Sequence, residues 1–423
     1  MINRKVVVSG MGILSSFGLG VDTLLQALKT ADCKISIWNE AKKDDADIIS
    51  VGAKMQDFSL NSALEELNIK DEKLKNLAKE VSRRSDKVIQ SAVLASLEAY
   101  QSAGLDEHPV QSERMGVIVA GSNISQNYLY KLFEKYHDKI GFVTPSHALH
   151  FMDTNLVGVL SELFAIKGEG YNIGGASASG NVGLIKGWQM IQSGLTDCCM
   201  VVAPMTELSS LEFAAFHNLN AMGGKKYADK PLEASRPFDA SSEGFIYGQA
   251  SACIILETEK SAKQRGIEPV ADFLGGAQCL DGNRLSDPSL EGEIRIMEEV
   301  IKLANIDKKD INYVNAHGTS TPLGDKTEIQ AIKQVFHDAL GEICVNSTKG
   351  ITGHCLYSAG VVEAIASILQ MQHGFVHPNR NLEEPIDDAV RLVQQEERME
   401  IKYTLSNSFG FGGIDTCIVL GKR

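Results

Sequence analysis

The sequence lacks any long run of apolar residues. The first apolar run, residues 6–8, ends at Ser9 and Gly10 and is too short to be the apolar core of a signal peptide. A helix that spans a membrane needs about 20 predominantly apolar residues, and no such stretch occurs. We therefore expect a soluble protein of the cytoplasm that has no membrane partner.

Cysteine pairs at metal-binding or redox spacing are also absent. The 8 cysteines include no Cys-x-x-Cys pair, and most lie in apolar stretches, where a thiol packs as a small hydrophobic side chain. Disulfides persist in oxidising compartments, so the pattern predicts reduced structural thiols in a reducing compartment. We expect no metal and no bound cofactor.

Positive charge is in short supply. The 41 lysines and arginines are outnumbered by 54 aspartates and glutamates, which gives a formal net charge of −13 at pH 7. A protein that binds nucleic acid neutralises phosphates with clustered lysine and arginine. The charge balance therefore argues against DNA or RNA as a partner.

What the chain does contain is an alternation of short β-branched runs and longer helical patterns. The runs predict strands at residues 5–9, 116–120, 199–203, 252–256, 311–315, 342–346 and 416–420. Apolar residues at three- and four-residue spacing predict helices at residues 21–29, 86–103, 178–192, 291–304 and 361–371. Such an order of elements is typical of an α/β protein whose helices cover its sheets.

The length of 423 residues fits two domains or one large α/β unit. A polar stretch at residues 257–268 is the predicted boundary, which gives an N-terminal half of residues 1–258 and a C-terminal half of residues 259–423. Residues 57–84 are a charged helical or loop insertion. Each half ends in a glycine-rich, β-rich segment, and this would suit a fold built from two similar halves.

Residues 171–181 read YNIGGASASGN and place Ser177 between a predicted strand and a predicted helix. The backbone N–H groups at a helix N-terminus favour anions and oxyanions. A hydrolase nucleophile elbow has the pattern G-x-S-x-G, but Ser179 stands where its final glycine would be. A serine that merely caps the helix is the commoner alternative.

Two further segments each present a histidine after a predicted strand. Residues 314–325 read VNAHGTSTPLGD, in which His317 is followed by Thr319 and Thr321, whose hydroxyls could line a narrow polar channel. Residues 346–354 read NSTKGITGH, with Lys349 shortly before His354. An isolated histidine is more often structural, but these neighbours favour a functional site, and a nearby lysine favours a neutral imidazole that donates one N–H.

Residues 407–413 read NSFGFGG, with Phe409 and Phe411 between glycines. Taken alone, the segment fits core packing at a tight turn better than a wall beside a ligand. Together, the four segments resemble the β-ketoacyl synthases. The family motif Cys-x-x-Gly corresponds to residues 177–180, HGTSTPxGD to 317–325, KxxxGH to 349–354, and NSFGFGG to 407–413. The resemblance covers the whole chain and implies the thiolase-like fold, two similar halves in a layered α-β-α-β-α sandwich.

The departures from this family are as informative as the matches. Ser177 stands where condensing enzymes carry the nucleophilic cysteine, and no cysteine lies near enough in sequence to replace it. Residues 248–251 read GQAS in place of GEGA, residues 203–207 replace a glycine-rich run, and Ile414-Asp415 replaces Thr-Asn. The loss of the acyl-accepting thiol is therefore expected to be real.

A condensing ketosynthase loads an acyl group on its cysteine and decarboxylates a malonyl thioester. Loading needs a thiolate, whereas a serine hydroxyl ionises far less readily and needs a general base. Decarboxylation needs only a polarised thioester carbonyl. The resemblance implies that His317 and His354 donate to the enolate oxygen, that Lys349 tunes this pair, and that Phe409 shields the malonyl carboxylate.

Thr319, Thr321 and Phe411 would contact the phosphopantetheine arm of an acyl carrier protein, the expected partner and substrate carrier. The predicted function is decarboxylation of malonyl-acyl carrier protein to acetyl-acyl carrier protein, as in the freestanding Cys-to-Ser decarboxylases of polyketide β-branching cassettes. The family also implies a homodimer. A local basic patch that could include Arg83, Arg84 and Lys87 would meet the acidic carrier.

Two other functions fit the serine. One is a non-catalytic partner subunit like the chain-length factors, which generally lose the histidines or carry glutamine at the nucleophile position. The other is a transacylase or slow condensing enzyme that forms an ester on Ser177 with one histidine as base. Retention of both histidines, Lys349 and both threonines favours a working decarboxylase.

Overall fold

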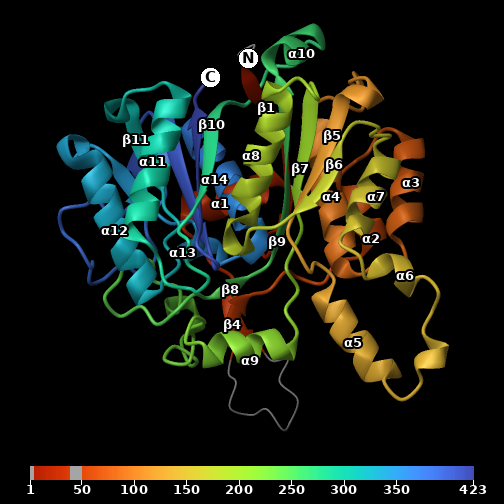
Figure 1. Cartoon of the computed structure of the whole chain (residues 1–423), viewed down its shortest axis with the longest axis horizontal. Coiled ribbons are helices and arrows are strands. Elements are labelled where there is room, and N and C mark those ends of the chain that lie inside the picture. Colours follow the sequence, from red (N-terminus) through yellow and green to blue (C-terminus); the bar gives the residue numbers. More distant parts are fainter. Residues whose placement is uncertain (1–3, 39–49) are drawn as a thin grey trace.

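The computed structural model describes residues 4–38 and 50–423. Its main feature is a mixed sheet of 11 strands, ordered β12-β11-β15-β16-β10-β1-β9-β7-β5-β6, with β2 paired to β1 (Figure 1). The strands are β1 (Val6–Ser15), β2 (Gly18–Leu19), β5 (Met115–Ala120), β6 (Gly170–Ile173), β7 (Cys198–Ala203), β9 (Ala250–Thr258), β10 (Ala271–Leu280), β11 (Ile311–Asn315), β12 (Cys344–Asn346), β15 (Tyr403–Gly410) and β16 (Ile414–Gly421).

Helices cover this sheet and fill the space between its two halves. The longer ones are α1 (Val21–Thr30), α3 (Glu72–Ser82), α4 (Lys87–Ser102), α5 (Gln126–Tyr136), α7 (Thr154–Leu163), α8 (Ser179–Gln192), α9 (Ser210–Asn218), α11 (Leu290–Ala304), α12 (Pro322–Phe336) and α14 (Ala359–His373). Within the described residues, no helix combines the length and the apolarity that a membrane span requires.

The remaining strands and helices are short. A small sheet contains β3 (Ile35–Trp38), β4 (Ser50–Ala53) and β8 (Tyr247–Gly248), and a two-stranded sheet contains β13 (Phe375–Val376) and β14 (Glu397–Arg398). The short helices are α2 (Leu60–Glu66), α6 (His147–His150), α10 (Glu259–Gln264) and α13 (Lys349–Thr352).

The fold repeats itself. The order β1-α4-β5-α7-β6-α8-β7-β9 recurs as β10-α11-β11-α12-β12-α14-β15-β16. Strand directions recur as well: β7 pairs parallel with β5 and antiparallel with β9, as β15 does with β11 and β16. An antiparallel β1–β10 pair joins the halves. The prediction of two similar halves is therefore confirmed, while a domain boundary at residue 258, the last residue of β9, stays a prediction.

The two copies of the repeat form five layers. Helices α8 and α14 lie at the centre, where they contact each other and the strands of both half-sheets (Figure 1). Helices α4 and α7 cover the outer face of the N-terminal half-sheet, and α11, with α12 packed beside it, covers the C-terminal one. The observed layering confirms the predicted thiolase-like α/β fold.

Side-chain caps mark where helices begin. The Asp86 carboxylate accepts a hydrogen bond from the Ile89 N–H (3.0 Å) at the start of α4. Ser289 accepts from the Gly292 N–H (3.1 Å) at the start of α11. These caps satisfy backbone donors that the helix itself leaves unpaired.

All seven predicted strands and all five predicted helices occur, with ends shifted by at most two residues, except that β1 continues six residues beyond its predicted end, to Ser15. The charged insertion at residues 57–84 contains α2 and α3. The long strands β10 and β15 were absent from the prediction, because glycines interrupt the first and the second is polar, whereas β6 is the strand predicted, without bounds, before Ser177. Ser406, Asn407 and Ser408 of β15 are nevertheless buried, and each side chain has a hydrogen-bond partner inside the protein.

Helices α8 and α14 cross at a pair of glycines. A Cβ atom on Gly180 would lie 2.7 Å from the Val361 backbone nitrogen, and one on Gly360 would lie 2.7 Å from the Asn181 backbone nitrogen. Any side chain at either position would therefore collide with backbone, which cannot move aside as a side-chain end can. The crossing brings the N-termini of two helices from different halves together.

We predict that Gly180→Ala lowers the free energy of unfolding by about 2 kcal/mol or more, because a methyl group must force the two helices apart. Gly158→Ala is the matched control: Gly158 also lies inside a helix, α7, but a Cβ there meets no atom within 4 Å. That change should raise stability by about 0.5–1 kcal/mol. Denaturant unfolding measures both, and equal stabilities for the two variants would contradict the crossing.

Candidate active site

Ser177 lies in a 3-10 turn, η3 (Ala176–Ala178), between β6 and α8. Ala176 adopts a left-handed backbone with φ of 49°, which is unfavourable for any residue with a side chain. The Ser179 hydroxyl holds this turn, because it accepts from the Gly175 N–H (2.9 Å) and donates to the Ala176 carbonyl (2.7 Å). The turn presents the half-buried Ser177 side chain at the N-terminus of a central helix.

His354 reaches the same point from the other half of the molecule. Its Nε2 lies 3.0 Å from the Ser177 Oγ, and its Nδ1 accepts a hydrogen bond from the Leu356 backbone N–H (3.3 Å). Because Nδ1 accepts, the single hydrogen of the neutral ring is on Nε2. His354 therefore donates to Ser177 and leaves no free nitrogen to act as a base toward it.

His317 is held by the loop that follows β11. The carboxylate of Glu328, on α12, accepts from the backbone N–H groups of His317 and Gly318, both at 2.8 Å. Asn407 of β15 donates to the same carboxylate at 2.9 Å. Three elements distant in sequence thus fix the position of the His317 imidazole.

Lys349 lies behind His317 and is almost fully buried. Its Nζ has three acceptors: the His317 carbonyl oxygen (2.6 Å), the His317 Nδ1 (3.4 Å) and the Glu363 carboxylate, with which it forms a buried ion pair. Three acceptors match the three donors of an ammonium group. Since Nδ1 of His317 accepts, the ring hydrogen is on Nε2, as in His354.

Both imidazoles are neutral at physiological pH. Burial lowers the pKa of His317 well below its usual value, and the Lys349 charge and His354 lower it further. Burial and then Lys349 lower the pKa of His354 in the same way. Burial raises the pKa of Glu363 to about 7, against the opposing effect of Lys349. His317 and His354 therefore present two N–H donors, and neither ring carries a charge.

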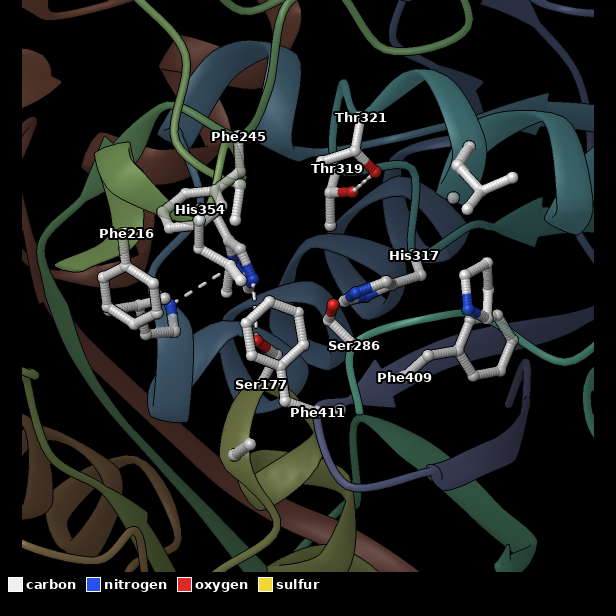
Figure 2. Close-up of a pocket in the computed structure, with 18 of the residues that line it drawn as sticks. Ser177, Phe216, Phe245, Ser286, His317, Thr319, Thr321, His354, Phe409 and Phe411 are labelled. Carbon is white, nitrogen blue, oxygen red and sulfur yellow. Dashed lines mark hydrogen bonds between the residues drawn. The ribbon is translucent and has the colours of Figure 1, made fainter. Parts of the chain in front are cut away.

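The two rings and Ser177 open onto one cavity of about 510 Å³, lined by both halves (Figure 2). The ring centroids are 5.6 Å apart, with planes at 85°, so the two Nε2–H groups lie in one small region of the cavity. Of the eight site residues predicted from the sequence, seven line this cavity: Ser177, His317, Thr319, Thr321, His354, Phe409 and Phe411. Lys349 supports it from behind.

Aromatic rings enclose the histidine pair. Phe409 meets the His317 ring edge to face at 5.5 Å between centroids, and Phe245 meets His354 at 5.3 Å. The Thr319 and Thr321 hydroxyls are 2.8 Å apart and lie across the cavity from Ser177 (Figure 2). An apolar enclosure strengthens hydrogen bonds to an oxygen that gains charge. Within the described residues, no His, Cys, Asp and Glu cluster could hold a metal ion.

Sequence reasoning missed several residues of the site. Glu328, Glu363 and Phe245 were not singled out, nor was the Leu356 backbone N–H that fixes the His354 tautomer. Glu363 did leave a signal, because it is the only charged residue among positions 359–371. The other contacts join distant segments and have no local signature.

Two departures from the family pattern take on structural meaning. The Gln249 side chain uses both ends of its amide: Oε1 accepts from the Met55 N–H (3.1 Å), and Nε2 donates to the Tyr247 hydroxyl (3.2 Å). Asp415 is buried, and one of its oxygens has no hydrogen-bond partner in the described part of the chain. Burial and then neighbouring Asp281 raise the pKa of Asp415 to about 8.

Comparisons with known proteins agree with this geometry. The β-ketoacyl synthase N-terminal domain matches residues 3–262, and the C-terminal domain matches residues 272–383. The chain belongs to the β-ketoacyl synthase family.

Two curated relatives show the range of this family. The chain is 36% identical to a polyketide biosynthesis malonyl-ACP decarboxylase, PksF, of Bacillus subtilis, over 98% of this chain and 96% of that one. It is 31% identical to 3-oxoacyl-[acyl-carrier-protein] synthase 1 of Buchnera aphidicola, over 99% of this chain and 100% of that one.

Solved structures agree in fold. A β-ketoacyl synthase from Burkholderia phymatum superposes with a TM-score of 0.86 at 27% identity, over 99% of this chain and 100% of that one. A type II polyketide ketosynthase, solved with its acyl-carrier protein, gives a TM-score of 0.88 at 24% identity, with both chains fully covered.

The raised pKa of Asp415 predicts a pH-dependent stability effect. Between pH 4 and 8 the folded state keeps a proton that the unfolded state releases, so this group makes the wild type less stable as pH rises. Asp415→Asn removes this pH-dependent loss. The free energy of unfolding of Asp415→Asn minus that of wild type should therefore increase by roughly 2–4 kcal/mol from pH 5 to pH 8.

Denaturant unfolding at the two pH values measures this difference. Asp388→Asn, at an exposed position in a loop, is the matched control and should show no such trend. A relative stability of Asp415→Asn that does not change with pH would contradict the assignment.

Proposed function

We propose that the protein removes carbon dioxide from a malonyl group on an acyl carrier protein and leaves acetyl-carrier protein, in polyketide biosynthesis. The observation that carries the proposal is the convergence of two neutral imidazole N–H donors on a cavity whose nucleophile position holds a serine. The enolate-forming half of ketosynthase chemistry has its groups, while the acyl-accepting thiol is replaced.

The two donors would act on the thioester oxygen. As the bond from Cα to the carboxylate breaks, carbon dioxide leaves and the electron pair forms an enolate, whose oxygen gains negative charge. Donors already in place stabilise this charge without reorganisation. Phe409 would keep water from the departing carboxylate, a role proposed from its place beside His317.

The carrier's phosphopantetheine arm would enter past Thr319 and Thr321, with Phe411 beside it. The Bacillus subtilis relative carries the name of a malonyl-ACP decarboxylase, and one ketosynthase of the same fold is solved with its carrier. Both support an acyl carrier protein as partner. We further propose that the acetyl-carrier protein feeds an enzyme that adds a β-branch to a polyketide.

A basic groove offers a place for the acidic carrier. Arg84, Lys87 and three more lysines, Lys54, Lys131 and Lys135, line a second cavity of about 850 Å³, where they outnumber three acidic residues, Asp57, Asp86 and Glu207. Leu208 lines both cavities, so the groove adjoins the active site. Arg83 is exposed beside it but does not line it. Complementary charge would speed and orient docking.

The location proposed is the cytoplasm. All eight cysteines are free thiols, and every one except Cys279 is buried. Free thiols are the state expected in a reducing compartment.

The two competing functions are less well supported. A non-catalytic partner subunit does not need the buried contacts that hold His317 and His354 as neutral donors. A transacylase needs a base for Ser177, but Nε2 of His354 carries hydrogen and its Nδ1 accepts from Leu356. The serine is therefore not activated as a nucleophile by this ring.

A homodimer is proposed from an uncovered edge and an uncovered apolar surface. Residues 391–393 cover β12 at one end of the sheet, whereas β6 at the other end has β5 as its only partner strand in the described part of the chain and has exposed residues. Large apolar side chains are also exposed on α5 and in the segment that joins it to α7, namely Phe133, Ile140, Phe142, Leu149 and Phe151. A second copy would cover both features.

The activity prediction uses malonyl-carrier protein and its intact mass. Wild-type protein should convert it to acetyl-carrier protein with no acylated enzyme. His317→Ala should lower the turnover rate by about 10²–10³, because one of two donors to the developing oxyanion is lost. His373→Ala, at the exposed end of α14, is the control and should leave turnover unchanged. Full activity in His317→Ala, or no carbon dioxide loss in wild type, would refute the proposal.

The dimer prediction uses sedimentation. Wild type should sediment at twice the chain mass of 45.9 kDa, whereas a Phe133→Asp/Phe142→Asp variant should be a monomer, because burial of the new charges is unfavourable. Leu303→Asp changes an exposed apolar residue on α11 and should stay dimeric. A wild-type monomer, or a dimeric double variant, would rule out this interface.

A further inference from the structure

Decarboxylation leaves an enolate that must gain a proton at Cα before acetyl-carrier protein can leave. In condensation, the enolate would attack an acyl group instead, so no acid is needed. The N–H groups of His317 and His354 are directed at the enolate oxygen and do not serve Cα. Resting on the proposed function, we infer that the Ser177 hydroxyl delivers this proton.

The hydrogen-bond geometry frees the Ser177 hydrogen. His354 Nε2 carries its own hydrogen, so the Ser177 Oγ at 3.0 Å is the acceptor of that bond. Among the described residues, His354 is the only hydrogen-bond partner of this hydroxyl. Its hydrogen can therefore point into the cavity, toward a bound substrate.

The same geometry places the hydroxyl beside Cα. A thioester oxygen that shares the His354 Nε2–H with the Ser177 Oγ, in a three-centre hydrogen bond, would lie about 3 Å from that nitrogen. Cα is two bonds from this oxygen, and the Ser177 Oγ is itself 3.0 Å from the nitrogen. The substrate Cα and the Ser177 Oγ would thus lie close together at the N-terminus of α8.

The other hydroxyls of the cavity are less suitable. Thr319 and Thr321 bond to each other and lie on the far side of the histidine pair (Figure 2). Ser286 lines the cavity on the side of His317 and Phe409 (Figure 2). The Ser122, Thr206 and Tyr357 hydroxyls and the protonated Asp415 carboxyl line the cavity as well, so Ser286 is one of several alternative donors. Loss of a single configuration in Ser177→Ala is the result that separates Ser177 from all of them.

The helix end makes the transfer chemically reasonable. The Ser177 O–H bond breaks as the new C–H bond forms at Cα, and the alkoxide then takes a proton from a water molecule that enters the cavity. One solvent proton is consumed for each carbon dioxide released. The alkoxide is stabilised meanwhile by the N-terminus of α8 and by the His354 N–H.

The inference gives the serine a function that cysteine could not perform. A cysteine at a helix N-terminus tends to be ionised, and a thiolate has no proton to donate. A serine at the same place stays protonated at neutral pH. The substitution therefore removes an acyl acceptor and supplies an acid at the same point.

The experiment follows the configuration of the new methyl group. Malonyl-carrier protein with one deuterium of known configuration at Cα is decarboxylated in tritiated water, and the methyl group of the acetyl product is analysed. Wild type should give one configuration, because a fixed donor protonates one face. Ser177→Ala should give a racemic methyl group, while carbon dioxide release falls by less than about tenfold, since protonation follows C–C cleavage.

Two variants complete the test. Ser177→Thr keeps a hydroxyl and should restore a single configuration, whereas Ser286→Ala should keep the wild-type configuration. A single configuration from Ser177→Ala, a racemic product from wild type, or a racemic product from Ser286→Ala would overturn the inference. Absence of carbon dioxide release from wild type would instead overturn the proposed function, so the two failures are distinguishable.

Discussion

The contact on which the site depends is the crossing of α8 and α14 at Gly180 and Gly360. Each glycine lies at the N-terminal end of a central helix, and neither position has room for a Cβ atom. Because the backbones touch there, the turn that carries Ser177 in one half meets the loop that carries His354 in the other. The repeated fold therefore creates a site at its own pseudo-symmetry centre.

The second constraint is electrostatic. One buried ammonium group, Lys349, is bonded to the His317 carbonyl, the His317 Nδ1 and the Glu363 carboxylate. Burial, and then the charge of this ammonium group, lower the pKa of both imidazoles. Lys349 also fixes the tautomer of His317, while the Leu356 backbone N–H fixes that of His354. Charge and hydrogen-bond direction are thus set before substrate arrives, as transition-state stabilisation requires.

Much of this could be predicted from the sequence, for physical reasons. Glycine-rich segments beside Ser177, His317, His354 and Phe409 mark chain turns at strand ends, where side chains can face a common cavity, and the periodic segments between them give the layers. The rest depends on distant contacts. Glu328 reaches the His317 loop, and Asp415 meets Asp281, only because the chain folds back, so neither appears as a local pattern.

The most direct test of the central claim is the protonation state of the two rings, read by ¹⁵N NMR of histidine-labelled protein. We predict that His317 and His354, assigned by single substitutions, both carry hydrogen on Nε2 and none on Nδ1 at pH 7. Neither should titrate between pH 7 and 5.5, because burial and Lys349 lower both pKa values. An imidazolium signal from either ring in that range, or hydrogen on Nδ1, would contradict it.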